Sequence, residues 1–200
     1  MDLKSSNIDK IVIASTNKDK ITQIINFGLF SECEMLSYPC AVEENGNSLQ
    51  ENALIKARHC FEKTGLPSLA DDSGLFIQAI GGAPGIHCKR FAQKSNGYNN
   101  AAKILNDMLG KLEDRNAYFA TAAAFVWDNI ELTATGKTWG QFIYPGVPEE
   151  SANNYRNFFI PKTENITCGQ ADLNDLRFCY HRFCAMRDLK TLISERFYKR

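Results

Sequence analysis

The sequence lacks the marks of several large protein classes. No run approaches the roughly 18 consecutive apolar residues of a transmembrane helix. Lys and Arg number 23 and Asp and Glu also number 23, so the formal net charge is +0. A general nucleic-acid binder carries a basic excess, so we expect no nucleic acid as partner. The opening segment has no apolar core of a secretory signal, and we expect a cytoplasmic protein without a membrane partner.

Signatures of metal cages and of common nucleotide-binding folds are also missing. The 7 cysteines are an odd number without a Cys-x-x-Cys pair, which fits neither a disulfide framework nor a zinc site. We expect reduced, mostly buried thiols. No Gly-x-Gly-x-x-Gly is present, so a Rossmann oxidoreductase has no support. Gly136-Lys137-Thr138 does not complete a P-loop, because Glu131 stands where the first glycine is required.

The chain does contain an alternation of strands and helices. Its 200 residues, of which 44% are hydrophobic, predict a single domain over residues 1–200. A β-branched run predicts a strand over 10–15, and polar residues then lead into a helix that starts near Ile21. Strand, polar loop and helix in this order aim backbone N–H groups at an anion. A second strand is expected over 33–38.

The clearest helix is predicted between Ser48 and Gly65. Ser48 and Glu51 form a capping box, in which the Ser48 hydroxyl accepts the Glu51 N–H and the Glu51 carboxylate reaches back to Ser48. Gly65 suits a left-handed C-cap, and Pro67 prevents continuation. Further strands are expected over 67–70, 75–80, 118–127, 130–135 and 137–144, a tight loop over 81–85, and helices over 99–112 and 172–200. Early alternation followed by clustered strands predicts an α/β fold with a mixed sheet.

Asp71-Asp72-Ser73-Gly74, between two predicted strands, is the first candidate for chemistry. Adjacent carboxylates at a strand end suit Mg²⁺, which prefers oxygen ligands and retains several waters. Neighbouring side chains of an extended segment point to opposite faces, so one Asp ligates and the other orients or caps. A solvated turn is the alternative, because Asp, Ser and Gly are common turn formers.

Two further acidic and basic patterns are weaker alone. Glu43-Glu44 provides a second acidic ligand only if the fold brings it beside Asp72; otherwise it is a solvated pair. Asn52 and Lys56 are four residues apart and share one face of the predicted helix. The Lys56 ammonium suits a phosphate oxygen, although an exposed lysine on an amphipathic helix is the commoner case.

Two patterns in the second half offer contacts to a base. Tyr155, Phe158 and Phe159 can form a stacking face, although such aromatic residues are more often part of a core. His181-Arg182 supplies donors able to bind carbonyl edges or phosphates, with a surface pair on a helix as the alternative.

These motifs, taken in order, resemble the inosine triphosphate pyrophosphatase or Ham1 family. The resemblance is carried by Ser15-Thr16-Asn17-Lys18-Asp19-Lys20, Glu51-Asn52-Ala53-Leu54-Ile55-Lys56-Ala57, Asp71-Asp72-Ser73-Gly74-Leu75, Gly81-Gly82-Ala83-Pro84-Gly85 and His181-Arg182. Five ordered matches over nearly the whole chain are not expected by accident. Thr16 departs from the pattern, because the family usually has a glycine beside the phosphates there.

The resemblance implies an elongated α/β fold with a mixed sheet, flanking helices and two lobes around a central cleft, and it implies a homodimer. It also implies Mg²⁺-dependent cleavage of ITP, dITP and XTP to monophosphate and pyrophosphate. By the resemblance, Asp72 is the catalytic carboxylate and binds the metal together with Glu44. The substrate contacts it implies are Ser15, Thr16, Asn17, Lys20 and Lys56 on the triphosphate side, Ser73, and Tyr155, Arg156, His181 and Arg182 on the base side.

Departures from the family pattern gather in the second half, over residues 153–158 and before His181. Arg156 stands where an Asp is expected, Tyr180 replaces a Ser, and Leu176 falls where a basic residue is usual. The phosphate and metal side therefore matches the family while the base side is changed. Two alternatives stay open: a family member with altered base specificity, and a nucleotide-binding module without turnover.

Overall fold

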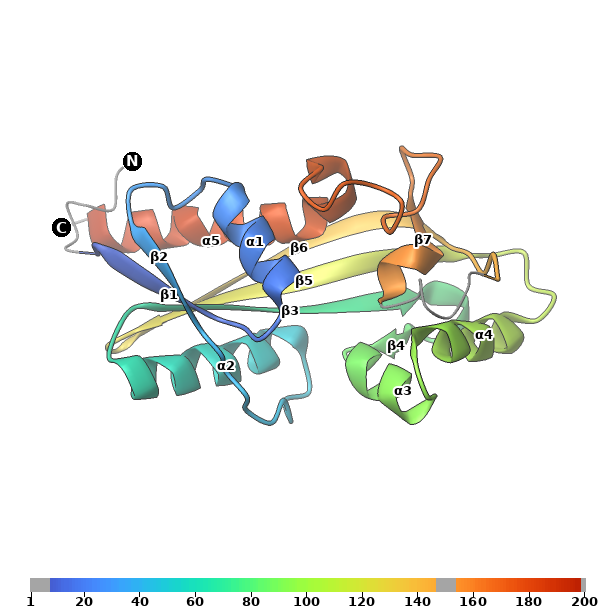
Figure 1. The fold of residues 1–200 in the computed structure, drawn as a ribbon, viewed down its shortest axis with the longest axis horizontal. Helices are drawn as coiled ribbons and strands as arrows, with labels where there is room; N and C mark the ends of the chain where they lie inside the picture. The colour runs from blue at the N-terminus through green and yellow to red at the C-terminus, as the bar shows by residue number, and fades with distance from the viewer. Residues whose placement is uncertain (1–7, 147–153, 199–200) are drawn as a thin grey trace. The chain divides into compact units, whose positions relative to one another are not determined.

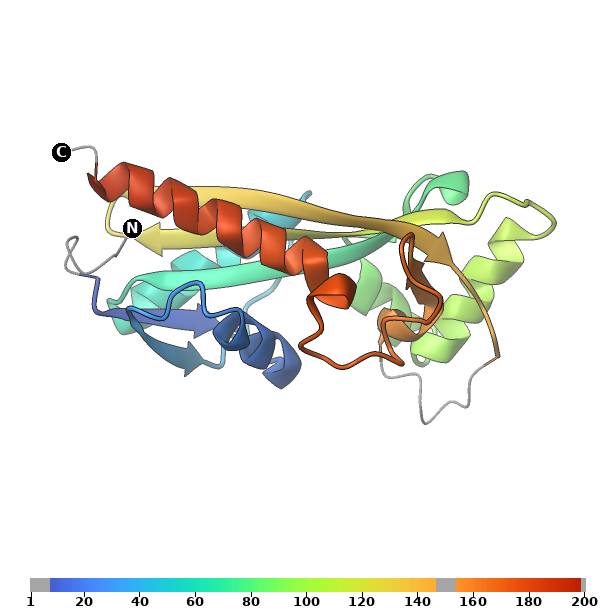
Figure 2. The same ribbon diagram turned by 90° about the horizontal axis from the view of Figure 1, so that it is seen from above.

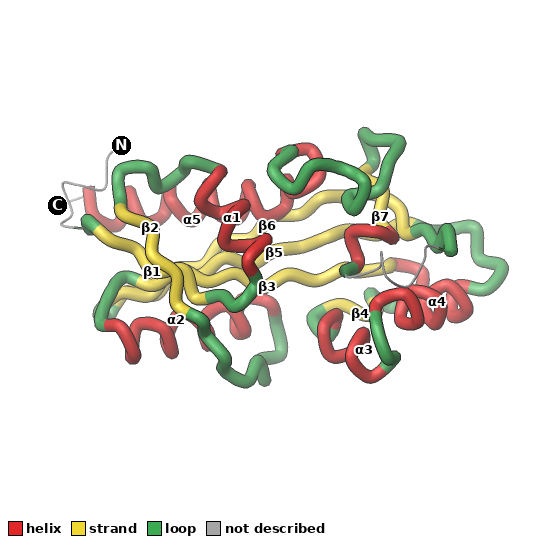
Figure 3. Tube along the Cα trace, viewed as in Figure 1, coloured by secondary structure: helices red, strands yellow, loops and turns green. Residues whose placement is uncertain are grey.

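The computed structural model describes residues 8–146 and 154–198. Its elements in chain order are β1 (Lys10–Ala14), α1 (Lys18–Asn26), β2 (Glu34–Tyr38), α2 (Leu49–Thr64), β3 (Ser68–Ile77), the 3-10 helix η2 (Gln78–Ile80), β4 (Ala83–Gly85), α3 (Cys88–Lys94), α4 (Tyr98–Leu109), β5 (Asn116–Trp127), β6 (Ile130–Phe142), the 3-10 helix η4 (Tyr155–Phe158), β7 (Phe159–Pro161) and α5 (Leu176–Tyr198). The strands are hydrogen-bonded in the order β2-β1-β3-β5-β6-β7, with β4 paired to β3 (Figure 3). β1 is parallel to β2 and β3, whereas β4 is antiparallel to β3 and β7 to β6. The predicted α/β fold with a mixed sheet is confirmed.

The chain divides into two compact units. Unit 1 comprises Met1–Asp72, Thr121–Gly136 and His181–Arg200, and unit 2 comprises Ser73–Ala120 and Lys137–Tyr180. Strands β3, β5 and β6 contribute residues to both units. The units therefore share strands, although each has its own hydrophobic core.

Unit 1 has a largely aliphatic core. Figures 1 and 2 show α1 and α5 on one side of its strands and α2 on the other. β1 is buried from Ile11 to Ala14, a continuous apolar run typical of a strand covered on both faces. Ala185, Met186, Leu189 and Ile193 of α5 pack in the same cluster.

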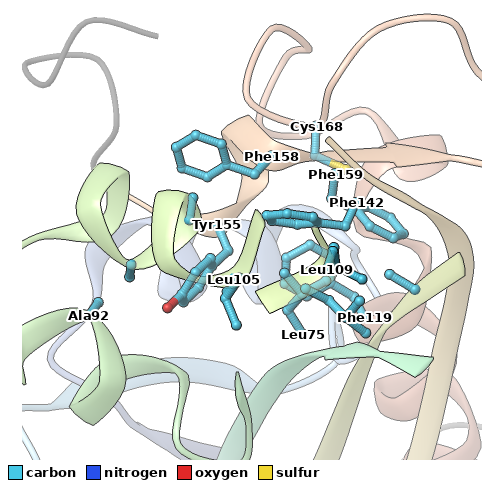
Figure 4. Close-up of a cluster of buried hydrophobic side chains, with 14 of the residues drawn as sticks. Leu75, Ala92, Leu105, Leu109, Phe119, Phe142, Tyr155, Phe158, Phe159 and Cys168 are labelled. Carbon is cyan, nitrogen blue, oxygen red and sulfur yellow. The ribbon is translucent and has the colours of Figure 1, made fainter. Parts of the chain in front are cut away.

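Unit 2 has an aromatic core, drawn in Figure 4. The rings of Phe119 and Phe159 meet edge to face with centroids 4.9 Å apart. Tyr155 of η4 meets Tyr98 of α4 in the same geometry at 5.1 Å. Leu105 of α4 is fully buried in this cluster, so the helix and the rings close one core.

Two interruptions predicted from the sequence are wrong. The break between strands expected at Asp71-Asp72-Ser73-Gly74, and with it the alternative of a solvated turn, does not form, because β3 is continuous and pairs with β1 before it and with β4 after it. Backbone pairing and burial override turn propensity here. β6 likewise continues through Gly136. A Cβ atom at that position would collide with the carbonyl oxygen of His181 on α5, so this glycine allows close packing of strand and helix.

Other predictions are confirmed with small shifts. Ser48 Oγ accepts the Glu51 N–H at 3.1 Å, and Gly65 ends α2 in the left-handed region with φ 67°. The Glu51 carboxylate reaches the N–H of Asn47 at 2.6 Å rather than that of Ser48. The loop expected over 81–85 contains the short strand β4.

All 7 cysteines of the chain lie in the described residues and are free thiols. Among the described residues, no helix combines the length and apolar character needed to cross a bilayer.

Candidate active site

A group of buried and half-buried charged side chains lies in unit 1, contributed by α1, α2, β3, α5 and the loop before α2. Asp71 of β3 contacts two cations: its Oδ2 lies 3.0 Å from Lys20 Nζ and 3.1 Å from Arg182 Nε. Arg182 also donates from Nη1 to Gln23 Oε1. The Asp71 and Arg182 side chains are 1% and 9% exposed, so these contacts are shielded from water.

Asp72, the next residue of β3, has different partners. Lys56 Nζ lies 3.5 Å from Asp72 Oδ1 and also 3.5 Å from Glu44 Oε1. Asn52 donates from Nδ2 to Asp72 Oδ2 at 3.1 Å and accepts the Gly46 N–H at Oδ1 at 2.9 Å. Through Asn52, the loop carrying Glu44 is tied to α2, and α2 in turn is tied to Asp72 of β3. Glu44 and Asp72 thus share one cation, so the fold does bring Glu44 close to Asp72, which the sequence alone could not show.

The surroundings set the two aspartates apart. Burial alone would raise the pKa of Asp71, but Lys20 and Arg182 hold that pKa well below its usual range. Burial raises the pKa of Asp72, against the opposing effect of Lys56 and Lys20. Burial lowers the pKa of Lys20, whereas the neighbouring carboxylates outweigh burial and raise the pKa of Lys56. Asp71 is therefore a fixed anion, and Asp72 is the better proton acceptor.

The site balances its own charges. Three cations and three carboxylates make up the cluster, namely Lys20, Lys56 and Arg182 with Glu44, Asp71 and Asp72. In the described part of the chain, no group of three or more His, Cys, Asp or Glu residues could hold a metal ion. Asp72 and Glu44 offer two carboxylates, which suits a Mg²⁺ ion that takes its other ligands from water and phosphate.

The loop from β1 to α1 brings Lys20 to the site. Asn17 is the N-cap of α1, and its Oδ1 accepts N–H groups of the first turn, including that of Lys20 at 3.3 Å. Ser15 Oγ accepts the Asn17 N–H at 3.1 Å. Thr16 and Asn17 are exposed and Ser15 is half-buried, so this loop presents polar groups at a helix N-terminus.

The residues from Ser73 onward that were expected to contact the substrate are divided between the two units. Ser73 is half-buried in β3 and belongs to unit 2. Tyr155 is buried in the aromatic core of unit 2. Arg156 donates from Nη2 to the carbonyl oxygen of Cys168 at 2.7 Å. Asn153, with which the changed segment begins, lies outside the described residues.

His181 and Arg182 both lie on α5 and are buried in unit 1. Two members of the site, Asn52 and Gln23, had no role assigned from the sequence. Gln23 follows Lys20 by three residues and therefore shares its helix face, which is the signal that could have identified it.

Comparison with known proteins gives consistent matches over both units. A model described as the Ham1 family matches residues 11–192. The chain is 32% identical over 195 residues to a dITP/XTP pyrophosphatase of Campylobacter jejuni subsp. doylei, covering 92% of this chain and 96% of that protein. It is 34% identical over 189 residues to a dITP/XTP pyrophosphatase of Nautilia profundicola, covering 88% and 93%. The solved HAM1 protein of Coxiella burnetii matches with TM-score 0.78 and 30% identity, covering 93% of this chain and 98% of the other.

Proposed function

The chain belongs to the Ham1 family, and on that premise we propose that it is a nucleoside triphosphate pyrophosphatase that removes non-standard nucleotides. Its proposed substrates are ITP, dITP and XTP, and its products are the monophosphate and pyrophosphate. Relatives named dITP/XTP pyrophosphatase, similar over most of the chain, support this activity. The main structural support for this proposal is that the Lys56 ammonium lies 3.5 Å from both Asp72 and Glu44.

Mg²⁺ is the proposed cofactor, with Asp72 and Glu44 as its protein ligands. Their carboxylates are the hard oxygen donors that Mg²⁺ prefers, and two of them suffice when phosphate oxygens complete the shell. Since the six charges of the cluster cancel, a bound divalent cation supplies the positive excess that a triphosphate requires.

The chain's own residues support hydrolysis at the α-phosphorus. Asp72 orients a water molecule and takes its proton, while the water oxygen bonds to phosphorus and the bond to the β-phosphate oxygen breaks. Asn52 and Lys56 each hold one oxygen of this carboxylate. Lys20 and Lys56 contact the triphosphate and stabilise the negative charge of the departing pyrophosphate. Ser15, in the loop before α1, contacts the same phosphates.

A pyrophosphate-release screen tests the proposal. We expect release from ITP, dITP and XTP to exceed release from dUTP and the four standard triphosphates. Asp72→Asn should lower kcat by about 10²–10⁴-fold, the usual loss on removing a general base. The matched control is Asp188→Asn, because Asp188 pairs with Arg187 at the surface of the same unit. Near wild-type release from Asp72→Asn would overturn the assignment.

Altered base specificity is the second candidate, favoured by the environment of Arg156. Its bond to the Cys168 carbonyl oxygen places a cation where the family pattern has an Asp. The same panel decides this, since specificity is a ratio of kcat/KM values. Better turnover of a pyrimidine triphosphate than of ITP supports altered specificity, and binding of ITP without pyrophosphate release supports a binding module.

A homodimer and a cytoplasmic location are also part of the proposal. An exposed ring supports self-association: Trp139 of unit 2 is 47% exposed and contacts Tyr118 with centroids 4.7 Å apart. Tryptophan is enriched at protein interfaces. Sedimentation equilibrium should give twice the mass of 22.5 kDa, and a monomer over the full concentration range would contradict the dimer.

A further inference from the structure

The loop that carries Glu44 is held against α2 on both sides of this residue. On the N-terminal side, the Cys40 thiol donates to the carbonyl oxygen of Lys56 at 3.6 Å. On the C-terminal side, the Gly46 N–H donates to Asn52 Oδ1 at 2.9 Å. Both contacts are made to the same helix, so α2 determines where the loop places the Glu44 carboxylate.

The side chain of Asn52 also joins this loop to β3. Its Nδ2 donates to Asp72 Oδ2 at 3.1 Å, while its Oδ1 accepts the Gly46 N–H. Asn52 is only 1% exposed, so water does not replace either partner. A backbone N–H can only donate and a carboxylate can only accept, so the group between them must offer an acceptor at one end and a donor at the other. An amide does so, whereas a carboxylate or a hydrocarbon of the same length does not.

Gly46 can approach this amide because it has no side chain. A Cβ atom at Gly46 would lie 2.8 Å from Asn52 Oδ1 and 2.6 Å from Glu51 Cβ. The φ angle of Gly46 lies outside the left-handed region, so the backbone conformation itself would accept an alanine. Glycine is therefore required here for close approach of the loop to α2.

We propose that Asn52 is a positioning residue for the Mg²⁺ site, that it holds the loop of Glu44 in place beside Asp72, and that Gly46 makes this contact possible. This inference rests on the proposed function. It specifies which residues, beyond the two carboxylate ligands and Lys56, set the affinity of the site for its metal.

The charges of the site give the physical reason. Two carboxylates that share a site repel each other, so a free loop would carry Glu44 away from Asp72. Lys56 offsets this repulsion, but an ammonium is a point charge and does not fix the direction of a carboxylate. The amide fixes that direction, because it holds Asp72 Oδ2 while Lys56 lies beside Oδ1. A loop that is already in place need not be ordered when the metal binds, which raises the affinity.

Metal binding in the absence of substrate tests this role directly. Mn²⁺ replaces Mg²⁺ as the probe, and the free ion is measured by electron paramagnetic resonance in the presence of the protein. The variants are Asn52→Leu, Gly46→Ala and the two combined, with Asp72→Asn to show the loss of a ligand itself. The matched control is Asn100→Leu, because Asn100 of unit 2 donates from Nδ2 to the carbonyl oxygen of Asn96 at 3.2 Å.

We expect Asn52→Leu to weaken Mn²⁺ binding by about 10–100-fold, the usual effect of losing a group that orients a metal ligand. Gly46→Ala should weaken it less, because it breaks the contact to the loop and leaves the one to Asp72. The double variant should bind no more weakly than Asn52→Leu, since both substitutions remove the same hydrogen bond. Asn100→Leu should behave as wild type.

Turnover of ITP at increasing Mg²⁺ concentration separates positioning from a general structural role. Excess Mg²⁺ should recover most of kcat in Gly46→Ala, because metal binding draws the loop back into place. It should not do so in Asn52→Leu, in which Asp72 has lost the Asn52 donor. A merely structural role predicts instead that the two losses add in full and that excess metal recovers neither variant.

The inference is overturned if either single variant binds Mn²⁺ as tightly as wild type while Asp72→Asn does not. If Asn52→Leu does not fold, as judged by circular dichroism, Gly46→Ala decides alone. A wild-type protein that binds Mn²⁺ without hydrolysing any triphosphate overturns the proposed activity, and the Mn²⁺ measurements still decide the inference. A wild-type protein that binds Mn²⁺ no more tightly than Asp72→Asn overturns the proposed metal site and this inference with it.

Discussion

Units 1 and 2 bury different kinds of side chain. Within the described residues, every buried Asp, Lys, Arg and His belongs to unit 1, namely Lys56, Asp71, Asp72, His181 and Arg182. In the described part of unit 2, the buried polar residues are Thr138 and Thr167, both uncharged. Burying charge costs free energy that pairing offsets only in part, whereas burying rings stabilises a fold directly. The comparison shows that the buried charges of the candidate site belong to unit 1, whereas unit 2 is built around an aromatic core.

The largest expected effect on stability comes from the core of unit 2. Phe159 is fully buried and packs edge to face on Phe119, so Phe159→Ala should lower the free energy of unfolding by about 3–5 kcal/mol. Urea denaturation measures the loss. Ile104→Ala in the same unit is the control, because the Ile104 side chain lies at the surface, 42% exposed. Equal losses in the two variants would show that the aromatic cluster is not the source of stability.

A buried cation of unit 1 should instead affect turnover most. Lys56→Met keeps an unbranched stem but leaves Asp72 and Glu44 without their shared ammonium. We expect kcat to fall by about 10²–10³-fold, as when one preorganised charge contact is removed. Stability should fall less than in Phe159→Ala, because Asp72 can take up a proton when its cation is lost. Lys103→Met is the matched control, since Lys103 forms an exposed pair with Asp107.

The two units also differ in how far the sequence predicted them. The capped helix α2 and strand β1 were predicted because caps and apolar runs are local signals. The continuity of β3 through Asp71 was not, since it depends on pairing with β1 before that residue and with β4 after it. Gln23 was not assigned because its partner Arg182 is 159 residues away in the chain.

The site could be predicted where two of its residues lie close together on one helix. Lys56 and Asn52 share a helix face, and both contact Asp72 in the structure. In unit 2, the aromatic pattern around Tyr155 allowed both a stacking face and a core. In the structure Tyr155 is part of the core. The sequence could not show this, because its burial depends on residues far away in the chain, such as Tyr98 of α4.

A smaller effect on stability, opposite in direction for Asp71 of unit 1 and Cys168 of unit 2, is expected from pH. The pKa of Asp71 is lowered, so its stabilisation is present above its unfolded value of about 3.9 and is lost as pH falls below it. Burial raises the pKa of Cys168 to about 12. Its stabilisation is present below its unfolded value of about 8.5 and is lost as pH rises toward the folded value.

The free energy of unfolding, measured by urea denaturation across pH, checks both directions. Asp71→Asn should flatten the acid side of the curve and leave the alkaline side sloping. Cys168→Ala should reduce the slope on the alkaline side and leave the acid side unchanged. A loss of the acid slope in Cys168→Ala would contradict the assignment of acid sensitivity to unit 1.

The smallest effect on the free energy of unfolding is expected from substituting a solvent-exposed ion pair of unit 1. Arg58 donates from Nε and Nη2 to the two Glu131 oxygens at 2.7 and 2.6 Å, yet the side chains are 47% and 41% exposed. Arg58→Ala should cost only about 0.2–1 kcal/mol, since water solvates the separated charges nearly as well. Urea denaturation at low and high salt measures the cost, which should shrink as salt rises because the pair is screened. A salt-independent loss as large as that of Phe159→Ala would mean that solvent exposure does not distinguish this pair from the buried cluster around Asp71.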